Sequence, residues 1–91
     1  MNRRAHIVVA GHVQGVCYRM NACMEARRSG VSGWVRNRPD GTVEMEVEGL
    51  PDAVEDMIRW CRMGPAMAVV SQVDVAEIKP LDDKKLFRIL N

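Results

Sequence analysis

The sequence predicts an α+β domain whose elements follow the order β-α-β-β-α-β, with a short extra strand at the end. Three observations lead to this prediction. Apolar β-branched runs alternate with segments of helical spacing, and glycine or proline separates them. Residues 42–48, "TVEMEVE", alternate strictly between apolar side chains and glutamates. The 91 residues, 47% of them hydrophobic, suffice for one packed core, so we expect a single domain over residues 1–91.

The first half of the chain predicts two strands and a helix. Residues 5–11, "AHIVVAG", are short, apolar and rich in β-branched side chains, which is typical of a strand. Residues 18–29 lack glycine and proline, and they place Tyr18, Ala22 and Ala26 on one stripe of a helix that ends at a glycine. Residues 32–37, "SGWVRN", predict the second strand.

The second half predicts a hairpin, a helix and a closing strand. The turn "RPDG" at 38–41 leads into the strand over 42–48, whose glutamates we expect on a solvated face, pairing with arginines across the hairpin. The helix that starts at Pro51 buries Val54, Met57, Ile58 and Cys61, one stripe at three- and four-residue spacing. Residues 68–78 predict a strand, and 86–90, "LFRIL", predict a short last one.

This order of elements predicts the ferredoxin-like sandwich, an antiparallel sheet with two helices on one face. Its first two strands run parallel, with the third strand between them. The loop after the first strand and the end of the second strand then lie at the same edge, about 10 Å apart. Those positions hold "VQGVCYR" (13–19) and Asn37.

The stretch "VQGVCYR" has two interpretations on its residues alone. It is either an ordinary turn from a strand into a helix or a cradle of backbone N–H groups for an anion. A helix N-terminus offers unpaired N–H groups, Gly15 allows close approach of a ligand, and Arg19 offers a planar fork that suits phosphate. Asn37 either ends its strand or orients a water molecule.

Composition excludes several other classes of function. A net charge of +1 gives no overall attraction to nucleic acid or to an anionic membrane. Three cysteines and two histidines lack the spacing of a metal site, so we expect no metal. No apolar run reaches membrane-spanning length, and "IVVA" is too short for a signal peptide, so we expect a cytoplasmic protein.

Two stretches resemble the signatures of the acylphosphatase family. "VAGHVQGVCYR" (9–19) is similar to the first signature, G-x-V-Q-G-V-x-F-R. "GWVRNRPDGTVEMEVEG" (33–49) is similar to the second, in which an asparagine precedes a glycine-containing turn and a strand. The final "LFRIL" resembles the closing F-x-I strand of the family. The resemblance covers nearly the whole chain, and the family fold is the sandwich predicted above.

The resemblance implies hydrolysis of an acyl phosphate to a carboxylate and inorganic phosphate, without metal or cofactor. Arg19 matches the arginine that binds the phosphoryl group, and Asn37 matches the asparagine that positions the attacking water. The backbone of the phosphate-binding loop corresponds to Gln14, Gly15, Val16, Cys17 and Tyr18, leading into Arg19. The expected partners are a small acyl phosphate as substrate and inorganic phosphate as product and inhibitor, and we expect a monomer.

Four positions depart from the family pattern or vary within it. Tyr18 replaces the usual phenylalanine, so its hydroxyl needs a partner. His12 stands where a basic residue is frequent, and Leu90 stands where many members have an arginine. Cys17 occupies a variable position, and we expect oxidation or capping of its thiol to crowd the cradle.

Two alternatives to an enzyme remain at this point. RNA-recognition domains share the sandwich, but they stack bases on strand aromatics, and the strand over 42–48 has three glutamates and no aromatic residue. We therefore expect no nucleic-acid partner. A non-catalytic relative that only binds anions or regulates a partner cannot be distinguished by fold alone.

Overall fold

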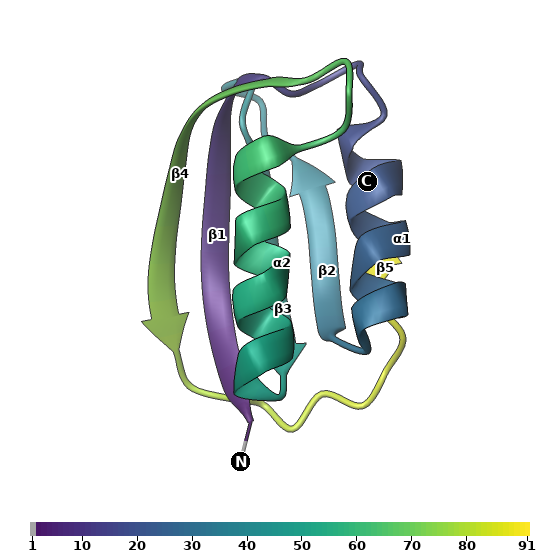
Figure 1. Ribbon diagram of the computed structural model, residues 1–91, viewed down its shortest axis with the longest axis vertical. Coiled ribbons are helices and arrows are strands. Elements are labelled where there is room, and N and C mark those ends of the chain that lie inside the picture. The colour runs from purple at the N-terminus through teal and green to yellow at the C-terminus, as the bar shows by residue number, and fades with distance from the viewer. Residues whose placement is uncertain (1) are drawn as a thin grey trace.

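The computed structural model describes residues 2–91, which form a five-stranded sheet with two helices packed on one of its faces (Figure 1). The elements along the chain are β1 (Arg3–His12), α1 (Tyr18–Ser29), β2 (Ser32–Asn37), β3 (Val43–Gly49), α2 (Pro51–Met63), β4 (Val69–Ile78) and β5 (Arg88–Ile89). The predicted fold class, the ferredoxin-like α+β sandwich, is confirmed. The first helix and the second strand have the predicted bounds, and α2 begins at Pro51 as predicted.

The sheet order is β4-β1-β3-β2-β5. Neighbours among β1 to β4 are antiparallel, and β3 lies between β1 and β2 as predicted. The fifth strand corrects the prediction of an antiparallel sheet, because β5 pairs with β2 in parallel. After β4, the chain crosses the lower end of the molecule and returns in the direction of β2, so the sheet is mixed (Figure 1).

Strand lengths differ from the predicted bounds at several ends. β1 runs from Arg3 to His12, longer than predicted, because it pairs with β3 on one side and β4 on the other. A bulge falls between Ala10 and Gly11. Gly11 has φ +127°, and a Cβ there would lie 2.1 Å from the carbonyl oxygen of Val69, so this close approach requires glycine. β5 covers only two of the five residues predicted for the last strand.

The core lies between the sheet and the helices, and it contains the stripes that the sequence predicts. Ala5, Ile7 and Val9 of β1 are fully buried. So are Val43, Met45 and Val47 of β3, together with Val54, Met57, Ile58 and Cys61 of α2. The helices are therefore held by the apolar faces opposite them, as in other two-layer domains.

The glutamates of β3 correct another prediction, because their face of the sheet is not freely solvated. Glu48 is only 1% exposed and accepts hydrogen bonds from the Arg4 guanidinium (3.0 Å) and the backbone N–H of Leu81 (2.8 Å). Glu44 pairs with Arg36, as expected across the hairpin. Arg38 instead lies 3.9 Å from Asp40 within the turn.

Candidate anion-binding site

The segment between β1 and α1, residues 13–17 (the 13–17 loop), alternates between positive and negative backbone φ angles at residues 15–17. Gly15 and Cys17 have φ of +76° and +63°, in the left-handed region, and Val16 between them does not. Alternation of this kind turns successive backbone N–H groups toward one concavity that suits an anion. Cys17 is also the N-cap of α1 and makes no side-chain capping hydrogen bond, so the first N–H groups of the helix keep their capacity for a ligand.

Gly15 keeps the loop open. A Cβ built at Gly15 would meet no atom within 4 Å, so the space beside it is empty rather than packed. Val13 before it is buried in the core and fixes the loop to the body of the domain. The loop is therefore anchored on one side and accessible on the other.

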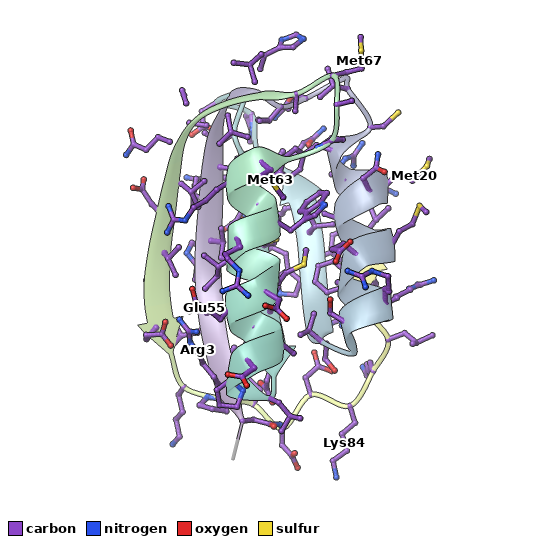
Figure 2. All side chains as sticks on the ribbon, viewed as in Figure 1. Arg3, Met20, Glu55, Met63, Met67 and Lys84 are labelled. Carbon is purple, nitrogen blue, oxygen red and sulfur yellow. The ribbon has the colours of Figure 1, made fainter. Side chains whose placement is uncertain are left out.

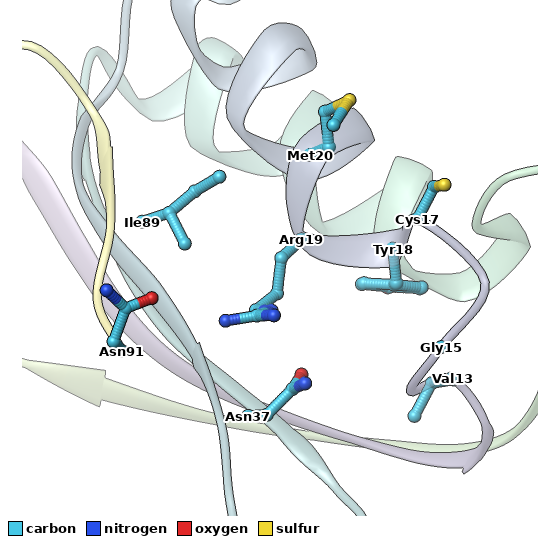
Figure 3. Close-up of a pocket in the computed structure, with 9 residues that line it drawn as sticks. All are labelled: Val13, Gly15, Cys17, Tyr18, Arg19, Met20, Asn37, Ile89 and Asn91. Atoms are coloured by element: carbon cyan, nitrogen blue, oxygen red, sulfur yellow. The ribbon is translucent and has the colours of Figure 1, made fainter.

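Arg19 lies in the first turn of α1, and its side chain is directed toward Asn37 (Figure 3). Within residues 2–91, the Arg19 guanidinium makes no hydrogen bond or ion pair, whereas Arg3, Arg4 and Arg36 are all paired with carboxylates. A half-buried, unpaired guanidinium beside a helix N-terminus provides five donors for an anion.

Asn37 is the last residue of β2 and faces Arg19 across the cavity (Figure 3). Its Oδ1 atom is buried and has no hydrogen-bond partner within residues 2–91. Because buried polar atoms in native proteins normally have hydrogen-bond partners, this oxygen indicates a place for a water molecule or ligand group that donates a hydrogen bond to it.

These groups line one cavity of about 230 Å³. Its lining combines the loop, the start of α1, the end of β2 and the C-terminal segment, namely Val13, Gly15, Cys17, Tyr18, Arg19, Met20, Asn37, Ile89 and Asn91. The structure thus brings together Gly15, Cys17, Tyr18, Arg19 and Asn37 of the predicted site. Gln14 and Val16 are not among the lining residues.

The Gln14 side chain lies outside the cavity and joins the loop to the β2–β3 turn. Its Nε2 donates to the carbonyl oxygens of Arg38 (2.8 Å) and Thr42 (2.9 Å). Val16 packs against the core. The side chains of Gln14 and Val16 therefore attach the loop to the turn and to the core and do not enter the cavity.

Tyr18 anchors the start of α1 to α2. Its ring is 1% exposed and lies 5.3 Å from the ring of Trp60, centroid to centroid. Its hydroxyl donates to the carbonyl oxygen of Cys61 (2.8 Å), which supplies the partner that the hydroxyl needs. Burial raises the pKa of Tyr18 well above its usual value, so the phenol stays protonated.

Three lining residues lie outside the predicted stretch, namely Met20, Ile89 and Asn91, and Val13 belongs to the stretch 13–19 but not to the predicted phosphate-binding residues 14–19. Ile89 and Asn91 belong to the C-terminal segment, which reaches the cavity because β5 pairs in parallel with β2 (Figure 3). The closing "LFRIL" stretch was the available signal, but its strand partner is not visible in the sequence. Leu90, where the family often has arginine, donates its backbone N–H to Val35 and does not line the cavity.

No group of three or more histidine, cysteine, aspartate or glutamate side chains within residues 2–91 is placed to hold a metal ion. No helix in this part of the chain is long and apolar enough to cross a membrane.

The fold and the cavity together define a small α+β domain in which a helix N-terminus, an arginine and an asparagine line one cavity. The family model for acylphosphatase matches residues 5–89, so the chain belongs to the acylphosphatase family. The two sequence signatures described above are thus part of a match along nearly the whole chain.

Relatives and solved structures agree with this assignment. The chain is 54% identical to an acylphosphatase from Anaeromyxobacter dehalogenans, over 94% of this chain and 92% of the relative. It is 44% identical to the Methylococcus capsulatus acylphosphatase over 97% of this chain and 96% of the relative. The crystal structure of Bacillus subtilis acylphosphatase superimposes with a TM-score of 0.93 at 34% identity, covering 100% of both chains. The protein is therefore a hydrolase acting on acyl phosphates.

Proposed function

We propose that the 13–17 loop and Arg19 hold the phosphoryl group of the acyl phosphate while Asn37 orients the attacking water. The observation that carries this proposal is the juxtaposition of two unsatisfied groups in one cavity. The unpaired Arg19 guanidinium and the buried, unpartnered Oδ1 of Asn37 face each other across it. An anion would satisfy the first group, and a water molecule would satisfy the second.

The chemistry follows from these positions. Oxygens of the phosphoryl group accept hydrogen bonds from the loop N–H groups and from Arg19, which spreads the negative charge that develops during transfer. A water donates to Asn37 Oδ1 and directs a lone pair at phosphorus, opposite the bond to the carboxylate. The P–O bond to water forms, the P–O bond to the carboxylate breaks, and the products are a carboxylate, inorganic phosphate and a proton.

The water needs no strong base at this site. The lining residues include no side-chain carboxylate and no imidazole, and an asparagine amide does not take up a proton at neutral pH. A carboxylate is a good leaving group, so positioning and charge stabilisation account for most of the catalysis, and a phosphoryl oxygen receives the proton of the water.

The test is phosphate release from benzoyl phosphate in the presence of a metal chelator. We expect Arg19→Ala to lower kcat/KM by about 10²–10³-fold and to weaken competitive inhibition by inorganic phosphate. We expect Asn37→Ala to lower kcat by a similar factor and to leave phosphate inhibition within about threefold, because Asn37 contacts the water. Arg62→Ala is the matched control, since Arg62 is exposed and, like Arg19, unpaired within residues 2–91.

Full activity in both Arg19→Ala and Asn37→Ala would overturn the assignment of the site. Absence of phosphate release by the wild type would favour the non-catalytic anion-binding alternative. Indifference of the wild type to inorganic phosphate would count against the cradle.

We also propose that residues 1–91 act as one domain, as a monomer and in the cytoplasm; Met1 lies outside the described residues. One continuous core supports the single domain. Cys17, Cys23 and Cys61 are free thiols, which fits a reducing compartment. Light scattering after size-exclusion chromatography tests the monomer, because a dimer would double the mass of 10.2 kDa.

A further inference from the structure

Gln14 makes the direct hydrogen-bonded connection between the two halves of the proposed site. Its Nε2 carries two protons, and both are used, one on the Arg38 carbonyl (2.8 Å) and one on the Thr42 carbonyl (2.9 Å). Both bonds have good length and are partly buried. Among residues 2–91, these are the hydrogen bonds that join the 13–17 loop to the β2–β3 turn.

The turn does not need Gln14 for its own closure. The N–H of Arg38 donates to the Thr42 carbonyl (2.9 Å), and the N–H of Gly41 donates to the Arg38 carbonyl (3.1 Å). The hydroxyl and the backbone N–H of Thr42 both donate hydrogen bonds to Asp40 Oδ1. Each carbonyl that accepts from Gln14 therefore keeps another partner when Gln14 is changed, and the cost of an orphaned acceptor is avoided.

The two ends of this connection lie next to the reacting groups. Gln14 directly precedes Gly15, which opens the cradle. Arg38 directly follows Asn37, and Thr42 directly precedes Val43, the residue paired with Asn37 in the sheet. The Gln14 amide thus connects the 13–17 loop, which would bind the phosphoryl group, to the strand end that carries Asn37, which would orient the water.

An in-line displacement depends on the distance between the phosphoryl group and the water, because a misplacement of about 1 Å between reacting groups can lower a rate by roughly 10²-fold. We propose that Gln14 is a positioning residue for the hydrolysis, setting the 13–17 loop against Asn37 so that the water lies in line with the bond to the carboxylate. This role rests on the proposed function above, and it assigns the Gln14 side chain a task other than binding phosphate.

The test uses Gln14→Met, which keeps the length and volume of the side chain and removes both donors. With benzoyl phosphate, we expect kcat to fall by about 10–100-fold. Inhibition by inorganic phosphate should stay within about threefold of wild type, since the cradle and Arg19 remain. Gln72→Met is the matched control, because Gln72 Nε2 also donates a hydrogen bond, to Asp74 on the outer side of the edge strand β4. It should leave kcat unchanged.

A double-mutant cycle separates positioning from general support of the fold. In an Asn37→Ala background, Gln14→Met should change the residual kcat by less than about threefold, because the group that it positions is gone. The same loss in both backgrounds would overturn the proposal. So would unchanged kcat in Gln14→Met, or a loss of phosphate affinity as large as the loss of kcat.

Two outcomes keep this inference separate from the proposed function. If Asn37→Ala retains full activity, the role of Asn37 in the proposed function fails, whatever Gln14→Met does. If Asn37→Ala is impaired and Gln14→Met is not, only the role of Gln14 fails. Should Gln14→Met not fold, Gln14→Glu, which also lacks both donors, takes its place in the cycle. Failure of both variants to fold would make Gln14 a structural residue and overturn the proposal.

Discussion

The two ends of the sheet treat their polar side chains in opposite ways. At one end, Arg4 and Glu48 lie opposite each other on neighbouring strands and are 2% and 1% exposed. The Arg4 guanidinium contacts Glu46 (2.8 Å) and Glu48 (3.0 Å), and Glu48 also accepts the backbone N–H of Asp83 (3.1 Å). Arg4, Glu46, Glu48 and Asp83 each have a charged partner within the described residues. We call these four residues the Arg4 cluster.

At the other end, the 13–17 loop, Arg19 and Asn37 leave donors and an acceptor without partners inside residues 2–91. The two ends are five residues apart along β2, since Ser32 pairs with Glu48 at one end and Asn37 pairs with Val43 at the other. The comparison teaches that the satisfied polar groups in this fold join neighbouring strands, whereas the unsatisfied ones are those that the proposed function assigns to the substrate and the water. The predictions below test that contrast, from the largest expected effect to the smallest.

Glu48→Ala should cause the largest loss of stability. It leaves the buried Arg4 with fewer partners and removes the acceptor of two backbone N–H groups, so the free energy of unfolding should fall by about 3 kcal/mol. Urea denaturation measures this change. Glu55→Ala is the control, because Glu55 is half-exposed and its pair with Arg3 should contribute less than about 1 kcal/mol. Equal losses in the two variants would remove the distinction between the ends.

Inorganic phosphate should stabilise the cavity end. Phosphate at roughly ten times its Kd should raise the free energy of unfolding by about 1.4 kcal/mol, because it binds only the folded chain. In a protein of this size, that corresponds to an increase in Tm of roughly 5–10 °C. Arg19→Ala should be close to wild type in stability without phosphate and should lose this increase. A full increase in Arg19→Ala would show that phosphate binds elsewhere.

Acid should act on the Arg4 cluster. Burial alone would raise the pKa of Glu48, but hydrogen bonds from the Leu81 N–H, the Arg4 guanidinium and the Asp83 N–H hold that pKa below its usual value. A lowered pKa in the folded state stabilises the protein above the usual pKa of about 4.3, and this stabilisation is lost as the pH falls through the folded value. The free energy of unfolding, measured from pH 6 downward, should therefore fall, and it should fall less steeply in Glu48→Gln. Identical slopes would contradict this assignment.

Thiol capping of Cys17 should have the smallest effect. Cys17 is exposed and lines the cavity, but its Sγ is directed away from Arg19 and Asn37 (Figure 3). A glutathione-sized group there should lower kcat/KM several-fold by crowding the cavity mouth. Cys17→Ser treated with the same reagent is the control, since Cys23 and Cys61 are buried. An unchanged rate in the capped protein would make Cys17 a bystander.

The methionines show that an apolar residue type does not by itself predict a buried position. Met20, Met24, Met63 and Met67 are each more than half exposed, whereas Met45 and Met57 are fully buried. Figure 2 shows Met20, Met63 and Met67 on the outside of the helices and of the α2–β4 connection. Spacing separates the two kinds, because Met45 and Met57 belong to the predicted apolar faces of β3 and α2 and the exposed methionines do not.

Local patterns in the sequence predicted most of the fold. Helix stripes, turn residues and the alternation of 42–48 depend on spacing along the chain, and short-range geometry is enough to read them. The two signatures likewise led to Arg19 and Asn37 before their positions were known. What local patterns missed are partners far apart in sequence: Glu48 appeared solvent-facing because Arg4 and the 81–83 backbone lie more than thirty residues away.

By itself, the sequence determined the order of elements, the core faces and the residue types available for an anion. The tertiary structure decided which polar groups are satisfied, because that depends on which strands are neighbours. It placed Ile89 and Asn91 on the cavity through the parallel β2–β5 pair, and it turned the Gln14 amide toward the β2–β3 turn rather than into the cradle. Hydrogen-bond partners separated by 24 and 28 residues are set by packing, and no local spacing encodes them.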